Sequence, residues 1–188
     1  EWMPTRMGEG GRIFRALDFG DLARLVLVDR QRRFLWPAAD DGHEFLGREQ
    51  SEWLDATVAG TSAAWLVLAQ ASRFASPSMS GEGHGWGDAS RERMLAARDS
   101  AGIRNLVVVG GNIHTAEALD VRRPQVSEYD PLTGEGSYGV ELLTGSITSP
   151  GGGSGTDGVP QVFWREGSFR HYLLLDVSPD RLQADWFG

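Results

Sequence analysis

Three short runs of consecutive apolar residues constrain the fold of this chain more than any other feature of its sequence. They are Leu25–Val28, Trp65–Leu68 and Leu106–Val109. A strand with one solvated face alternates apolar and polar residues, whereas a strand covered on both faces is apolar at consecutive positions. The runs therefore predict buried strands within a sheet that carries a layer of structure on each face.

Helical patterns lie between these runs. The segment from Glu49 to Ala59 predicts one helix, with apolar residues on one side and Gly60 as its stop. A second helix is expected to begin at Asp88 or Ser90, either of which can cap it, and to end near Gly102. Strands that alternate with helices in this way indicate an α/β fold.

The pattern changes after residue 120, where strands are expected without helices between them. A length of 188 residues fits a single domain. We therefore predict an α/β domain with a β-rich C-terminal part. Besides the second and third apolar runs, the expected strands are Arg12–Phe19, Leu22–Asp29, Val140–Leu143, Gln161–Glu166, Tyr172–Asp176 and Leu182–Trp186.

Composition excludes several classes of protein and site. The formal net charge is −8, which argues against non-specific nucleic-acid binding, because that needs a basic surface. The chain has no cysteine, so disulfides and thiolate metal sites are excluded. It also has no apolar run of about 18 residues, so no transmembrane helix is expected. It begins at Glu1, with no pattern typical of a signal peptide.

The turn after the third run, Gly110 to His114, is the strongest candidate site. Ligands of open α/β sheets bind at the carboxyl ends of the strands, and glycines let the backbone turn there sharply. Asn112 and His114 follow the two glycines. An amide oxygen and an imidazole nitrogen are both competent metal ligands. Taken alone, the pattern fits either a metal site or a structural turn.

Six segments resemble segments of PhoD-like alkaline phosphatases and phosphodiesterases, and they occur in the same order. Gly111–Thr115, for example, reads Gly-Asn-Ile-His-Thr where that family has Gly-Asp-Ile-His-Ser. No single segment is strongly specific, but the ordered set is. The other five are Trp2–Arg6, Leu46–Leu54, Trp65–Gln70, Gly145–Gly151 and Tyr172–Leu182.

This resemblance implies a calcineurin-like metallophosphoesterase fold, in which two sheets pack face to face with helices outside. It implies a site that hydrolyses phosphate esters with several metal ions, calcium and iron among them, and a periplasmic or secreted protein. Asn112 and His114 would be metal ligands. Gln70, Thr115 and Trp86 would be substrate-binding residues, although Thr115 could instead cap a helix that begins at Ala116.

Important parts of the family pattern are missing, however. The family's first metal-binding motifs lie upstream of the segment that Trp2–Arg6 resembles. The chain is therefore expected to be the C-terminal half of a larger catalytic domain, completed by a missing N-terminal half or a companion chain. Asp40–Glu44 resembles an Asp-His-Glu motif but lies in the wrong place, and it is interpreted as an exposed acidic loop.

Local departures leave the function open between alternatives. Asn112 replaces an Asp, and Gly87 and Ala89 stand where the family's Trp-Asp-Gly-Tyr loop has Asp and Tyr. These changes motivate a second hypothesis, a degenerate, non-catalytic member that binds a ligand or partner. A third hypothesis is a hydrolase or transferase of another oxyanion ester. Of the remaining histidines, His84 is expected in an exposed loop and His171 facing solvent or capping the sheet.

Overall fold

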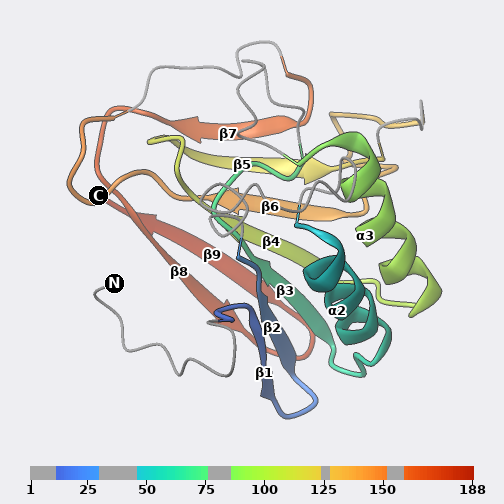
Figure 1. Ribbon diagram of the computed structural model, residues 1–188. Coiled ribbons are helices and arrows are strands. Elements are labelled where there is room, and N and C mark those ends of the chain that lie inside the picture. The colour runs from blue at the N-terminus through green and yellow to red at the C-terminus, as the bar shows by residue number, and fades with distance from the viewer. Residues whose placement is uncertain (1–11, 30–45, 76–85, 124–127, 152–158) are drawn as a thin grey trace.

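The computed structural model describes residues 12–29, 46–75, 86–123, 128–151 and 159–188. Its main element is a seven-stranded mixed sheet with the order β1-β2-β3-β4-β6-β5-β7 (Figure 1). β2, β3, β4 and β6 run parallel, while β1, β5 and β7 pair antiparallel with their neighbours. The strands are β1 Arg15–Phe19, β2 Ala23–Leu27, β3 Trp65–Ala69, β4 Leu106–Gly110, β5 Ala116–Val121, β6 Gly139–Leu143 and β7 Val162–Glu166.

The three apolar runs form the adjacent strands β2, β3 and β4, as their sequence predicts. Side chains alternate between the two faces of each strand. In β3, Leu66 and Leu68 belong to the core on one face, and Val67 belongs to the core on the other. Leu106 and Val107 of β4 divide between the two cores in the same way. Consecutive apolar residues are needed here because both faces are covered.

Two helices cover one face of the sheet. They are α2, Arg48–Ala59, and α3, Asp88–Ser100, and they lie side by side (Figure 1). Leu54 and Val58 of α2 pack into the same core as Met94 and Leu95 of α3. α3 begins at Asp88, but no side chain caps its first turn, so the expected Asp or Ser cap is wrong.

A two-stranded antiparallel sheet covers part of the other face. It consists of β8, Tyr172–Val177, and β9, Leu182–Phe187 (Figure 1). Leu173, Leu175 and Trp186 from this pair pack against the core that contains Val67. The indole nitrogen of Trp186 also donates a hydrogen bond to the Leu143 carbonyl at 2.9 Å. This face-to-face arrangement of two sheets, with helices outside the larger one, confirms the predicted fold class.

The strand β5, Ala116–Val121, differs from the sequence-based expectation. Its sequence, Ala-Glu-Ala-Leu-Asp-Val, contains good helix formers, and one interpretation of the sequence is a helix that begins at Ala116. That interpretation is wrong. β5 pairs antiparallel with β6 on one side and with β7 on the other, and this pairing outweighs the weak local propensity.

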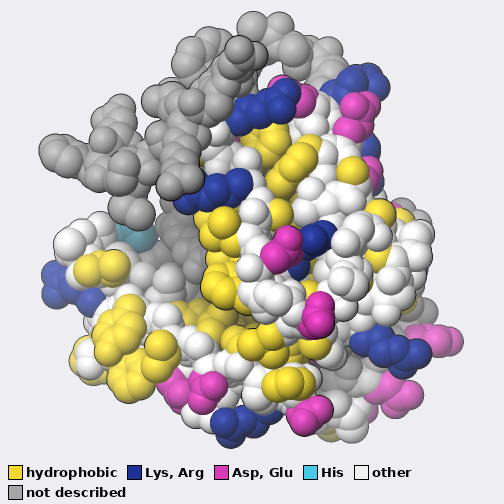
Figure 2. Space-filling view, turned by 90° about the horizontal axis from the view of Figure 1, so that it is seen from below, with side chains coloured by type: hydrophobic (Ala, Val, Ile, Leu, Met, Phe, Trp, Pro, Cys, Tyr) yellow, Lys and Arg dark blue, Asp and Glu magenta, His cyan; other side chains and the backbone are white. Residues whose placement is uncertain are grey.

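The surface of the described residues mixes apolar and charged side chains. On the face seen in Figure 2, apolar side chains reach the surface, with Arg, Asp and Glu side chains around them. The strand at one edge of the large sheet contributes exposed apolar residues of its own, Leu17 and Phe19. Within the described part of the chain, neither helix has the length and apolarity needed to cross a membrane.

We expect the Leu68→Ala substitution to lower the free energy of unfolding by about 3 kcal/mol, because it removes a fully buried side chain and leaves a cavity. The matched control is Leu132→Ala, since the Leu132 side chain is 94% exposed. Its effect should stay within about 0.5 kcal/mol. Urea unfolding of the two variants and the wild type measures both changes. Equal effects would contradict the position of β3 in the core.

Candidate functional site

The carboxyl ends of the parallel strands β3, β4 and β6 meet at one edge of the sheet, where ligands of α/β sheets bind. The turn from β4 to β5 lies at this edge and carries Asn112, His114 and Thr115. Gln70 directly follows β3, and its backbone N–H donates to the Val109 carbonyl of β4. The fold therefore brings the turn and Gln70 to the same edge.

Asn112 and His114 share an uncommon backbone conformation. Their φ angles are 74° and 58°, and among the described residues they are the only non-glycine residues with positive φ. Asn tolerates this left-handed region better than most residues, and His is also enriched there. Such conformations cluster at functional sites, where the surrounding structure imposes them. Both residues are exposed at the sheet edge, so their side chains are accessible to a ligand.

Gly110 is required by the close approach of β3 and β6 on either side of β4. A Cβ atom at this position would lie 2.9 Å from Nε2 of Gln70 and 3.0 Å from Cδ2 of Leu143. Any larger residue would displace the side chain of Gln70. The glycine therefore allows Gln70 to lie directly behind the turn.

Gln70 and Trp86 are brought into contact, as members of a buried hydrogen-bond network. The Gln70 side-chain oxygen accepts hydrogen bonds from the Ser72 backbone N–H at 2.8 Å and from the Trp86 indole N–H at 3.3 Å. Trp86 is itself buried, and its ring meets the edge of Phe74 with centroids 5.0 Å apart. In the described residues, the buried side chains of Gln70 and Trp86 therefore support the carboxyl ends of the strands from the interior of the protein.

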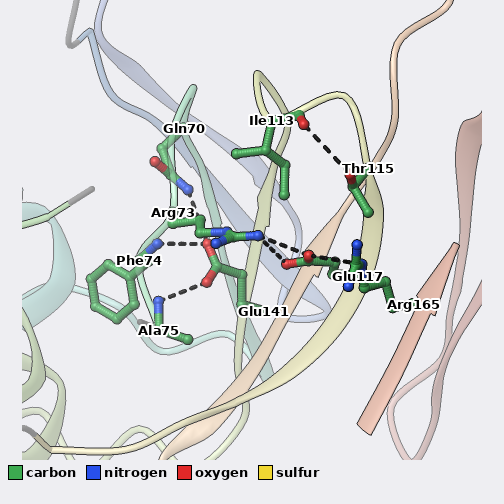
Figure 3. Close-up of polar contacts among 9 residues, drawn as sticks. All are labelled: Gln70, Arg73, Phe74, Ala75, Ile113, Thr115, Glu117, Glu141 and Arg165. Atoms are coloured by element: carbon green, nitrogen blue, oxygen red, sulfur yellow. Dashed lines mark hydrogen bonds and ion pairs between the residues drawn. The ribbon is translucent and has the colours of Figure 1, made fainter. Parts of the chain in front are cut away.

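Glu141 of β6 lies at the centre of this network. Its side chain is fully buried, and its two oxygens accept hydrogen bonds from the backbone N–H groups of Phe74 and Ala75, at 2.7 and 2.6 Å (Figure 3). Gln70 Nε2 donates a third, at 3.2 Å. One carboxylate thus fixes the chain that leaves β3.

The ionisation of Glu141 is shifted by its surroundings. Burial raises the pKa of Glu141 to about 7, and the two backbone N–H donors and the Arg73 charge oppose that rise. The charge of Glu117 adds to the rise. The carboxyl therefore titrates near neutral pH, well above the range of an exposed glutamate.

A second buried carboxylate, Glu117 of β5, lies beside the first. The guanidinium of Arg73 donates to both Glu117 oxygens, at 2.8 and 2.7 Å, and Arg165 Nε of β7 lies 3.8 Å from Glu117 (Figure 3). This pair joins the segment after β3 to the strand that begins directly after the candidate turn. Glu141, Glu117 and Arg73 thus link the segment that follows β3 to β6 and β5.

Sequence patterns alone assign no role to the buried charges of Glu117 and Glu141. A signal was present, because Glu141 interrupts an apolar strand and Glu117 sits among small and apolar residues. Carboxylates are almost never fully buried unless they are paired. Which residues pair with them follows only from the fold.

Two of the predicted polar residues lie deeper than their sequence context suggests. Thr115 is buried, and its hydroxyl donates a long hydrogen bond of 3.5 Å to the Ile113 carbonyl (Figure 3). His171 is also buried, which corrects the expectation that it faces solvent. The His171 backbone N–H donates to the Ser146 carbonyl, and Nδ1 of its ring has no hydrogen-bond partner in the described residues.

The residues of the turn fit part of a metal site. Asn112 offers an amide oxygen and His114 an imidazole nitrogen, and both residues are exposed just after the carboxyl end of β4. Within the described ranges, no group of three His, Cys, Asp or Glu side chains is placed to hold a metal ion. A metal at this edge would need further ligands beyond these two. The Asp40–Glu44 segment and His84 lie outside the described residues.

Comparison with known protein families shows which family this chain belongs to. The model of the PhoD-like phosphatase family matches residues 1–186. The chain belongs to this family. The turn with Asn112 and His114, the carboxylate network behind it, β8 and all of β9 but Phe187 fall within the matched residues.

Two known proteins show how much of a PhoD-like protein this chain represents. Alkaline phosphatase D of Bacillus subtilis (strain 168) is 26% identical over 218 residues, which cover 99% of this chain and 36% of that protein. A solved structure described as "Structure of PhoD" matches with a TM-score of 0.76 and 24% identity, covering 98% of this chain and 40% of that one. This likeness supports the fold. The chain thus spans well under half the length of either relative.

We expect the pH dependence of stability to report the raised pKa of Glu141. An unfolded glutamate ionises near 4.5, whereas folded Glu141 keeps its proton until about pH 7. Folding then favours the protonated form, so stability falls as pH rises from 4.5 to 7, by up to about 3 kcal/mol. Glu141→Gln resembles the protonated side chain and removes this titration. Urea unfolding from pH 4.5 to 8 should show that the wild type has a higher free energy of unfolding than the Gln variant at pH 4.5. This difference should shrink as the pH rises to about 7. A constant difference would contradict the assignment.

We also expect Arg73→Ala to destabilise the protein by about 3 kcal/mol, because it leaves the Glu117 carboxylate buried without its main partner. Arg181→Ala is the control, since Arg181 and Asp176 form an exposed pair. That variant should remain near wild-type stability. Thermal or urea unfolding of both variants makes the comparison, and similar losses from the two would exclude a structural role for the buried pair.

Proposed function

We propose that this chain is the C-terminal part of a metal-dependent phosphoester hydrolase of the PhoD type, acting on phosphomonoesters or phosphodiesters. One observation carries the proposal. Asn112 and His114, at positions that resemble the family's Gly-Asp-Ile-His segment, are both held in the left-handed region at the ligand-binding edge of the sheet. Family membership supports a phosphatase-type hydrolase.

In this proposal Asn112 and His114 bind a metal ion through the amide oxygen and an imidazole nitrogen. A bound metal polarises the phosphoryl group and lowers the pKa of a bound water. Calcium and iron are the metals that the family resemblance favours. The remaining ligands come from polypeptide outside this chain, either an N-terminal half or a companion chain. A periplasmic or secreted location is part of the same proposal.

The substrate-binding roles of Gln70, Thr115 and Trp86 stay predictions. All three side chains are buried behind the turn. The bonds from Ser72 and Trp86 hold the Gln70 oxygen in place. Their positions favour a supporting role for the turn over direct contact with an ester.

A second candidate function, a non-catalytic binding module, is favoured by residues that depart from the family pattern. Asn112 brings no charge to the turn, and Gly87 and Ala89 replace an Asp and a Tyr. Hard cations prefer carboxylates, so these changes weaken metal binding. Elemental analysis of the complete protein after dialysis separates the two candidates, because only the hydrolase needs stoichiometric metal.

The sharpest test uses two substitutions in the same turn of the chain co-expressed with its upstream segment. His114→Ala removes a ligand and should abolish hydrolysis of p-nitrophenyl phosphate with added calcium and iron. Asn112→Asp keeps the shape of the side chain, suits a positive φ and adds a carboxylate. It should raise metal affinity by about tenfold, which is about 1.4 kcal/mol.

Isothermal titration calorimetry and the phosphatase assay measure the two changes. The matched control is Asn105→Asp. Asn105 lies directly before the amino end of β4, whereas the turn follows the carboxyl end of the same strand. It should leave metal affinity unchanged. If the Asn112 and Asn105 variants bind metal equally, or if His114→Ala retains full activity, the turn is not the metal site.

A further inference from the structure

The candidate turn is attached at both ends to residues 70–75, the segment that directly follows β3 and that we call the anchor segment. At the start of the turn, a Cβ atom on Gly110 would lie 2.9 Å from Nε2 and 3.1 Å from the carbonyl oxygen of Gln70. Beyond its end, Glu117 accepts two hydrogen bonds from Arg73. A movement of the anchor segment therefore reaches the turn from both sides.

Glu141 holds the anchor segment through hydrogen-bond donors. Its Oε1 accepts from the Phe74 backbone N–H at 2.7 Å and from Gln70 Nε2 at 3.2 Å, and its Oε2 accepts from the Ala75 backbone N–H at 2.6 Å (Figure 3). Among the described residues, each hydrogen-bond partner of Glu141 is thus a donor. Hydrogen bonds to an ionised acceptor are the stronger ones. The ionised carboxylate therefore holds the anchor segment in one position.

The protonated form of Glu141 does not fit this arrangement. A neutral carboxyl group carries a proton that needs an acceptor, and of its three partners only the Gln70 side-chain amide also has an acceptor atom to offer. The amide must turn over to present its oxygen to Glu141. That oxygen now accepts hydrogen bonds from the Ser72 backbone N–H at 2.8 Å and from the Trp86 indole N–H at 3.3 Å. Both bonds break when the amide turns.

The charges around Glu141 leave both of its forms accessible. Burial raises the pKa of Glu141 to about 7, and the charge of Glu117 on β5 adds to the rise. Arg73 of the anchor segment and Arg91 of α3 attract the ionised carboxylate and oppose the rise. A change of pH within the neutral range therefore changes which form of Glu141 predominates.

We propose that ionised Glu141 positions Gln70, and through it the start of the candidate turn, and that proton uptake by Glu141 turns the Gln70 amide over and releases both. Hydrolysis then requires the ionised form, and this consequence alone rests on the proposed function. Local order and overall stability respond differently to pH. Ionisation strengthens three hydrogen bonds, whereas the buried charge lowers the stability of the whole fold.

The test uses two residue pairs, Phe74-Ala75 and Val109-Gly110, because Phe-Ala and Val-Gly each occur once in the sequence. In the complete protein, a ¹³C label on the carbonyl of the first residue and a ¹⁵N label on the second select the amides of Ala75 and Gly110 by NMR. Ala75→Ser and Val109→Ile each remove one labelled pair and so identify its signal. Both amide signals should shift with pH, with one common midpoint near pH 7.

Glu141→Gln should abolish both titrations. Glu135→Gln is the matched control, since Glu135 is exposed, and it should leave both titrations unchanged. If Glu141→Gln does not fold, Glu141→Asp keeps a carboxyl group on a shorter side chain, and the two midpoints should move together. The proposal is overturned if the amides of Ala75 and Gly110 do not share a midpoint, if Glu141→Gln leaves either titration in place, or if Glu141→Asp moves only one midpoint.

The pH profile of kcat with p-nitrophenyl phosphate tests the consequence for the site. In the wild type and in Glu135→Gln, kcat should fall about tenfold one pH unit below the NMR midpoint. In Glu141→Gln, kcat should stay low and lack this dependence on pH. An active Glu141→Gln protein that keeps the wild-type profile overturns the positioning role. If the complete protein hydrolyses no phosphate ester, the proposed function fails, and the NMR titrations still decide whether Glu141 positions Gln70.

Discussion

The burial of two carboxylates is the constraint on which the candidate site depends. Glu141 and Glu117 face the same core from neighbouring strands and have no contact with water. Such groups must be paired or hydrogen-bonded, because an unpaired buried charge costs several kcal/mol. Glu141 meets this requirement with the N–H groups of Phe74 and Ala75, and Glu117 with Arg73. The segment after β3 is thereby fixed against β5 and β6.

This anchoring explains how a short turn keeps an unfavourable backbone conformation. Asn112 and His114 stand in the left-handed region between β4 and β5, and strain of this kind persists only where the surroundings impose it. The surroundings are Gly110, which leaves room for Gln70 behind the turn, and Glu117, the second residue of β5, which Arg73 holds in place. The turn is thus held in this conformation by its neighbours before any ligand binds.

The unequal sizes of the two sheets have a physical meaning as well. Seven strands form one sheet and two the other among the described residues. The β8–β9 pair covers the sheet centre, and the region over β5 and β7 ends in an aromatic groove. Among the described residues, the β8–β9 pair therefore leaves Phe163 and Trp164 of β7 partly exposed at one edge of the larger sheet.

The sequence by itself determined the local elements. Consecutive apolar residues fixed β2, β3 and β4, periodicity fixed α2 and α3, and the glycines with Asn112 and His114 marked the turn, because these signals act between residues close in the chain. The tertiary structure decided what depends on distant partners. It made Ala116–Val121 a strand through β6 and β7, buried His171 and Trp86, and gave Glu141 donors about 66 positions away. Burial and pairing across the sheet are set by the whole fold, so no local pattern could specify them.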